Sequence, residues 1–278
     1  MLAFLVVVVG IGYVFSMAYD NYTILIIAIA FSLLMNFFSY WYSDKIVLSM
    51  YRAQPIVRDD NLMLWNTVEN LAITAGIPMP HVYIIPDNAP NAFATGRNKE
   101  HAAVAVTSGL LQILDKTELE GVIAHELSHI GNRDILLSTV VIVLVGFVSI
   151  LSQMFLRGMM FGGRRSNDRE GGNAIFVVIG LVLAILAPIS VTLVQLAISR
   201  KREYLADATG ALLTRYPEGL ASALKKISSS GQPMQHASQA TAHLFIANPF
   251  GGVGKKVSNL FSTHPPIEDR IRILEGME

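Results

Sequence analysis

Four long stretches without a charged side chain limit what this chain can fold into. A helix needs about 20 apolar residues to cross a bilayer, and Met1–Tyr19, Tyr22–Tyr42, Ile135–Leu156 and Ala174–Ile198 meet that standard. The composition agrees, because only 15% of the 278 residues are charged, whereas soluble domains carry about 25%. We therefore predict an α-helical integral membrane protein with four transmembrane helices.

The four stretches form two pairs. Only Asp20 and Asn21 separate the first two, so we expect a tight helical hairpin. The alternative is a cleaved signal peptide, which the missing basic n-region disfavours. The last two stretches have a second interpretation as buried core helices of a soluble protein. They exceed the usual globular helix of about 12 residues and are apolar on every face, which favours membrane spans.

Polar sequence separates the two pairs and follows the second. We accordingly divide the chain into a transmembrane hairpin at 1–42, a polar segment at 43–134, a second hairpin at 135–198 and a second polar segment at 199–278. Apolar spacing in the polar segments predicts an α+β domain that is split by the second hairpin. Helices are expected at 60–77 (ending at Gly76), from about Thr117, at 202–216, at 217–226 and after Pro266, and strands at 81–87, 91–96 and 101–108.

The sequence His125-Glu126-Leu127-Ser128-His129 carries the main chemical information. Residues four apart share one face of a helix, so both imidazoles can reach one metal ion while Glu126 lies beside them. Thr117 and Glu120 fit a capping box that would start this helix. The pattern predicts two zinc ligands and a general base, although HExxH also occurs by chance on surface helices.

A catalytic zinc ion takes three protein ligands and leaves one position open for water. Glu203, directly after the fourth stretch, is the best candidate for the third ligand. A hairpin of two spans returns the chain to its starting side, which places Glu203 on the same side as the HExxH helix. Asp207, one helical turn later, is positioned to orient a ligating histidine. The alternative is that both carboxylates are solvated or paired with neighbouring basic residues.

The remaining histidines and the absence of cysteine complete the candidate chemistry. His264, before two prolines, is a candidate donor to the oxyanion of the transition state or an additional metal contact, and the alternative is a turn residue; His243 ranks below it. No cysteine is present, which excludes thiolate zinc sites and disulfides. The 21 basic and 21 acidic residues balance, so nothing indicates nucleic acid as a partner.

These motifs together resemble the HtpX-type membrane metalloproteases, relatives of the CAAX prenyl proteases. The resemblance covers essentially the whole chain, including its alternation of span pairs and polar segments. With four spans rather than seven, the chain departs from the chambered prenyl protease type. The matching pieces are Asn91–Gly96, His125–His129, Glu203–Asp207 and His264–Pro266.

The resemblance implies a gluzincin-like zinc endopeptidase with one Zn²⁺ per chain, held by His125, His129 and Glu203, and with Glu126 as base. It also implies polypeptide substrates, in particular misfolded or damaged membrane proteins, and a stress or quality-control role. The expected location is the plasma membrane of a prokaryote, multi-pass, with the catalytic domain facing the cytoplasm. An edge strand beside the cleft is expected to bind substrate through Asn91, Ala92, Phe93 and Ala94.

Two other functions remain open. A membrane scaffold with a structural zinc ion would need a fourth ligand, for which His264 is available. A transporter or sensor is disfavoured because the spans carry no ionisable residue. The loop between spans three and four, 157–173, holds four arginines, which the positive-inside rule disfavours outside the cell. Either the loop is tolerated there, or these two spans do not cross fully.

The stretch Ser228–Asn259 is rich in serine, glutamine, glycine and alanine and contains one apolar patch, LFIANPF. This composition predicts a loop or mobile lid, and we interpret it as a regulatory segment that closes the cleft until substrate arrives.

Overall fold

A computed structural model describes the chain except for residues 1, 19, 142–199, 239–240, 252–264 and 278. The chain divides into two compact units, one of Met1–Ser43 with Val140–Val194 and one of Asp44–Thr139 with Gln195–Glu278. The second unit contains the HExxH sequence and Glu203. The four-segment functional division made from the sequence stays a prediction.

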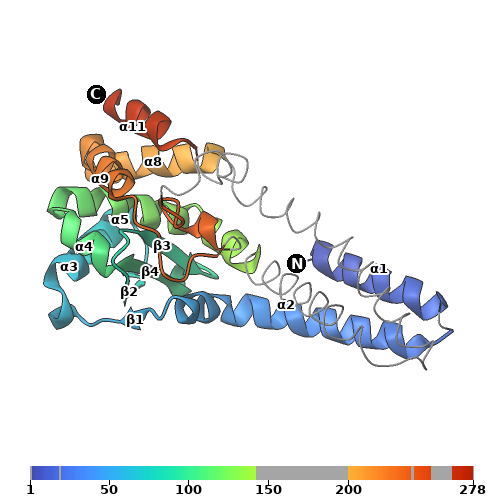
Figure 1. Cartoon of the computed structure of the whole chain (residues 1–278). Coiled ribbons are helices and arrows are strands. Elements are labelled where there is room, and N and C mark those ends of the chain that lie inside the picture. The colour runs from blue at the N-terminus through green and yellow to red at the C-terminus, as the bar shows by residue number, and fades with distance from the viewer. Residues whose placement is uncertain (1, 19, 142–199, 239–240, 252–264, 278) are drawn as a thin grey trace, which may run out of the picture. The chain divides into compact units, whose positions relative to one another are not determined.

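Helices α1 (Leu2–Ala18) and α2 (Tyr22–Met50) follow one another at the N-terminus (Figure 1). Within the described part of the chain, α2 alone is both long and apolar enough to cross a membrane, with a mean hydropathy of 2.0. Helix α1 is apolar but, at 17 residues, shorter. The predicted third and fourth spans lie outside the described residues, except for a helical start at 134–141. A protein of four spans therefore stays a prediction.

A four-stranded sheet forms the β part of the second unit, in the order β1-β2-β4-β3. The strands are β1 (Gln54–Pro55), β2 (His81–Ile85), β3 (Ala92–Gly96) and β4 (Ala102–Thr107). Strands β3 and β4 form the predicted antiparallel hairpin, whereas β2 and β4 pair in parallel. This order places β3 at one edge of the sheet, where a further extended chain can pair with it.

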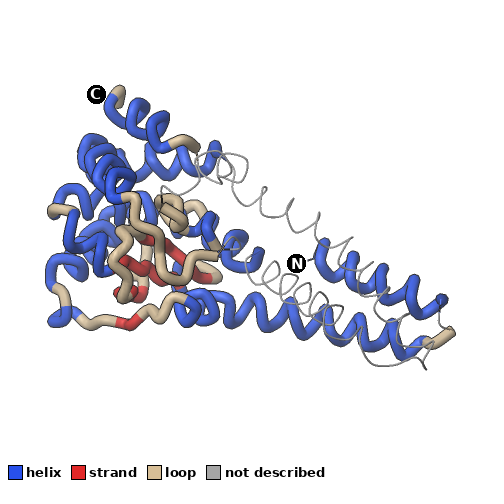
Figure 2. The backbone as a smooth tube through the Cα atoms, viewed as in Figure 1, coloured by secondary structure: helices blue, strands red, loops and turns tan. Residues whose placement is uncertain are grey.

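The helices of this unit surround a central helix, α5, which packs against α3, α8, α9 and β3 (Figures 1 and 2). Its buried face contributes Leu119, Val122, Ile123, Leu127 and Ile130 to one apolar core shared with the sheet. The remaining elements are η1 (Arg58–Asp60), α3 (Leu62–Ala75), η2 (Lys99–His101), α4 (Ser108–Ile113), α5 (Lys116–Gly131), α8 (Arg200–Thr214), α9 (Pro217–Ser230), η3 (Ala242–Leu244) and α11 (Ile267–Glu275).

Local sequence explains where these helices begin and end. Helix α3 ends at Gly76 as predicted, because its left-handed φ of 63° is costly for residues with a Cβ. The predicted start of α5 is wrong. Asp115, not Thr117, is the N-cap, and its capping-box partner is Glu118 rather than Glu120. The Asp115 carboxylate accepts from both the Glu118 backbone and the Thr117 hydroxyl, so Thr117 supports the cap from inside the helix.

Candidate metal centre

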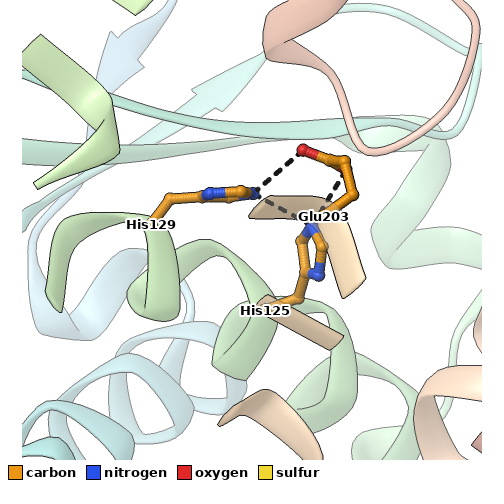
Figure 3. Close-up of side chains that lie close together, drawn as sticks. All are labelled: His125, His129 and Glu203. Carbon is orange, nitrogen blue, oxygen red and sulfur yellow. Dashed lines mark hydrogen bonds and ion pairs between the residues drawn. The ribbon is translucent and has the colours of Figure 1, made fainter. Parts of the chain in front are cut away.

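Two histidines on α5 and one glutamate on α8 converge in the second unit (Figure 3). The Nε2 atoms of His125 and His129 lie 3.2 Å apart. The Oε2 atom of Glu203 lies 3.8 Å from Nε2 of His125, and its Oε1 atom lies 3.6 Å from Nε2 of His129. The helix spacing predicted that the two imidazoles share a face, and the cluster has that arrangement.

The spacing of these ligand atoms fits a tetrahedral zinc ion. Zinc binds nitrogen and carboxylate oxygen at about 2.0–2.2 Å, so its ligands lie roughly 3.3–3.6 Å from one another. Each imidazole also has a carboxylate at its other nitrogen, Nδ1. If both Nδ1 atoms donate there, two acceptor nitrogens face each other at 3.2 Å, an arrangement that a cation between them stabilises. The donor set therefore suits a metal ion.

Two aspartates orient the histidines. Asp207, on α8, lies with Oδ1 2.9 Å from Nδ1 of His125, as the sequence predicted for a residue that fixes the tautomer. Asp134 plays the corresponding part for His129, with Oδ2 3.2 Å from its Nδ1. Sequence analysis missed Asp134. Arg133, with a left-handed φ of 61°, ends the turn after α5 and directs Asp134 back to the histidine.

Close packing of α8 on α5 sets the position of Glu203. Gly210 lies two turns after Glu203 on the same face of α8. A Cβ at Gly210 would lie 3.0 Å from the backbone nitrogen of His125. The absence of a side chain at Gly210 therefore lets the two helix backbones approach closely enough for a short glutamate side chain to reach both histidines.

Arg270 from α11 is a second residue that sequence analysis missed. Its side chain is fully buried, and its Nε and Nη2 donate to both oxygens of Asp207 at 2.8 and 2.6 Å. Its Nη1 donates to the backbone oxygen of Ile246 at 3.1 Å. Charge-assisted bidentate pairs of this kind hold a carboxylate in one orientation. Arg270 thus fixes Asp207, which in turn fixes His125.

Replacing Arg270 with Leu is expected to lower the free energy of unfolding by about 3–5 kcal/mol, because it leaves the buried carboxylate of Asp207 without its positively charged partner. Denaturant unfolding of the detergent-solubilised protein measures this loss. The double variant Arg270→Leu/Asp207→Leu removes both charges and is expected to recover part of it. Equal losses in the single and double variants would show that the uncompensated charge of Asp207 does not cause the loss.

Glu126 lies in the same cavity as the cluster. The residues that help to line this cavity include Ala94, His125, Glu126, His129, Glu203 and His243. Its side chain is buried, and within the described residues its Oε1 has no hydrogen-bond partner. Burial, together with the nearby charge of Glu203, raises the pKa of Glu126 to about 7 against the lowering effect of His129. A carboxylate with this pKa is suited to take up and return protons near neutral pH.

The pKa values of the two histidines are shifted in opposite directions. Burial lowers the pKa of His125 to about 4, against the raising effect of Asp207. Burial also acts to lower the pKa of His129, but its hydrogen bond to Asp134 and the charges of Glu203 and Glu126 raise it to about 9. A proton at His129 and a metal ion there compete for the same Nε2 lone pair, so metal binding requires that proton to leave.

The other predicted site residues lie at β3, in η3 or outside the described part of the chain. Ala92, Phe93 and Ala94 form most of β3, at the edge of the sheet, and Asn91 immediately precedes it. Each of these four residues is buried. His243, ranked low from the sequence, is buried in η3 and lines the cavity. His264 lies outside the described residues, so its role stays a prediction.

The sequence is similar to a known protein family and to named proteins. The family described as Peptidase family M48 matches residues 59–278. A protein of Syntrophobacter fumaroxidans named Protease HtpX homolog is 54% identical over 257 residues, which are 91% of this chain and 89% of that protein. A Pyrococcus furiosus protein of the same name is 52% identical over 277 residues, 99% of this chain and 92% of that one.

One solved structure, the crystal structure of S. mikatae Ste24p, resembles the chain with a TM-score of 0.54 at 18% identity. The match covers 95% of this chain and 62% of the Ste24p chain. At this identity the similarity concerns the fold alone.

Proposed function

This chain belongs to peptidase family M48, and from that premise we propose that His125, His129 and Glu203 bind one catalytic zinc ion. The chain is a metalloprotease of the HtpX type. One observation carries the zinc assignment: three ligand atoms from these residues lie within 4.8 Å of one another in a cavity that also contains Glu126. The activity that follows is zinc-dependent hydrolysis of internal peptide bonds.

Several side chains divide the work of hydrolysis. Zinc, when bound, supplies Lewis-acid activation of water and of the scissile carbonyl. Glu126 takes the proton from the attacking water and passes it to the leaving amine. Asp207 and Asp134 hold the two imidazoles in the tautomer that leaves Nε2 free for the metal. We assign donation to the developing oxyanion to His264.

Substrate binding is proposed at β3. An extended polypeptide pairs with the free edge of a sheet through its backbone, which gives affinity without a strict sequence requirement. Support comes from the position of β3 as the last strand of the sheet and from Ala94, which lines the cavity with Glu126. The proposed binding residues are Asn91, Ala92, Phe93 and Ala94.

The membrane setting leads to the proposed substrates. Helix α2 is suited by length and hydropathy to cross a bilayer, and a protease anchored beside lipid meets membrane proteins first. We assign the chain to the plasma membrane of a prokaryote, as a multi-pass protein whose catalytic unit faces the cytoplasm. Its proposed task is to cut misfolded or damaged membrane proteins during stress.

Cleavage of a heat-denatured membrane protein by the purified full-length chain in detergent tests this function, with fragments identified by mass spectrometry. We expect cuts at internal peptide bonds, and none in the same protein kept folded, because only an unfolded chain can lie along β3. Trimming from the termini alone, or equal cutting of folded substrate, would contradict the proposal.

A further inference from the structure

A short segment of the chain itself hydrogen-bonds to the outer edge of β3. We call residues Thr241–Ala247 the strap. The backbone N–H of Ile246 donates to the backbone oxygen of Ala92 at 3.0 Å. The side-chain amide of Asn91 donates to the oxygen of Ala247 at 3.0 Å and accepts from its N–H at 3.2 Å. The strap thus uses edge groups that an extended substrate would need.

The strap also borders the cluster of candidate metal ligands. His243, Leu244, Phe245 and Ile246 line the same cavity as His125, Glu126 and Glu203. A peptide bond positioned for attack near Glu126 would have to lie in the space that these strap residues border. The strap therefore shares two features with a bound substrate chain: it hydrogen-bonds to the edge of β3 and it reaches the cavity.

The strap is firmly packed, which differs from the mobile lid predicted for Ser228–Asn259. The ring of Phe245 is fully buried, with its centroid 4.9 Å from that of Tyr51 and 5.2 Å from that of Phe93. The Tyr51 hydroxyl hydrogen-bonds to Thr241 at the start of the strap. Arg270 donates to the oxygen of Ile246. Aromatic packing and hydrogen bonds thus hold the strap at both its start and its centre.

The free edge of a strand can pair with only one neighbouring chain at a time. From this geometry we propose that the strap is an autoinhibitory occupant of the substrate edge, and that it leaves β3 before an extended polypeptide can be cut. This inference rests on the proposed function of β3 as the substrate-binding strand. The resting enzyme is then closed, and the fraction of molecules with a released strap sets the apparent affinity for substrate.

A disulfide between the strap and β3 tests the proposal. The chain contains no cysteine, so in the variant Ala92→Cys/Ile246→Cys only the engineered pair can form. The backbone hydrogen bond from Ile246 to Ala92 brings the two residues close together, and a disulfide spans Cα separations of about 4.4–6.8 Å. In the full-length zinc-loaded protein, we expect oxidation to lower cleavage of denatured casein at least about tenfold and reductant to restore it. Equal rates in both forms would overturn the proposal.

Weakening the strap should have the opposite effect. Thr241→Val removes the hydroxyl that bonds to Tyr51 and donates to the backbone oxygen of Ser238, and it leaves the aromatic packing intact. Loss of the bond to Tyr51 is expected to raise cleavage of casein by about fivefold, through a larger open fraction. Thr74→Val is the matched control, because it removes an exposed hydroxyl that bonds within α3, and it should leave the rate unchanged. A Thr241→Val rate at or below that of wild type would contradict the proposal.

Binding of fluorescein-labelled denatured casein, measured by polarisation, separates this proposal from the proposed function. If the reduced cysteine variant binds casein at least about tenfold more tightly than the oxidised one, but neither cuts, the strap proposal stands and the protease assignment fails. If both forms cut and bind equally, the protease assignment stands and the strap proposal fails.

Discussion

Replacing Glu126 by Gln is expected to lower the rate of peptide hydrolysis by about 10²–10⁴-fold, the usual contribution of a general acid–base group. Glutamine has nearly the same volume as glutamate, so the buried position stays filled and the metal ligands stay in place. It cannot accept the proton from water. The measurement is kcat for an unfolded protein substrate, with the zinc content determined on the same preparation.

Glu120→Gln is the matched control for this prediction. Glu120 lies on the same helix, and its side chain forms an ion pair with Lys116 near the surface, so its replacement should leave both rate and zinc content unchanged. If the Glu126→Gln protein binds zinc and cuts at the rate of wild type, Glu126 is not the general base. If zinc stays bound and neither wild type nor variant cuts, the alternative of a membrane scaffold with a structural zinc ion would account better for the cluster.

Replacing Glu203 by Ala is expected to remove the metal. His125 and His129 alone offer two ligands from one helix, whereas zinc sites use at least three protein ligands. Losing an outer partner of a ligand costs about 10–100-fold in metal affinity, so we expect Asp207→Asn to lose about that much and Glu203→Ala to lose more. Competition with a chromogenic zinc chelator measures both affinities.

Glu218→Ala, on the exposed side of the first turn of α9, controls for a general effect of removing one negative charge. It should bind zinc as wild type does. Full zinc affinity in Glu203→Ala would mean that the third ligand comes from elsewhere, and His243, which lines the same cavity, is one candidate.

Local patterns were sufficient to predict much of this unit. The i, i+4 spacing of His125 and His129 defines a shared helix face, and Gly76 ends α3 because a left-handed residue is required there. Glu203 could be chosen because a two-span hairpin must return the chain to the same side. Each of these inferences depends on residues that are close in sequence or on an even number of predicted spans between two segments. Both can be read from the sequence alone.

Long-range contacts were not predictable in the same way. Arg270 lies in a short amphipathic helix whose charges suggest a solvated face, but it is buried against Asp207, 63 residues earlier in the sequence. Ile246 pairs with Ala92 from a segment whose composition suggested a loose lid. Asp134 follows His129 by five residues, and only the turn at Arg133 brings it to the imidazole. Tertiary packing, not local propensity, decides these positions.

For the membrane part too, local features could be predicted from the sequence and the larger arrangement could not. Apolar length is a local property, so the sequence correctly indicated that the region of α2 can cross a bilayer. The number of spans depends also on residues 142–199, which lie outside the described part of the chain. The four-span topology and its cytoplasmic orientation stay predictions.

Removal and return of zinc in the wild-type protein tests the central claim most directly. Cleavage of denatured casein should stop when a chelator strips the metal and should return in proportion to added zinc, reaching its maximum at about one ion per chain. Loss and recovery at this stoichiometry would support the assignment of His125, His129 and Glu203 as one catalytic zinc site. Cleavage that continues in the metal-free protein, with zinc content verified as negligible, would contradict it.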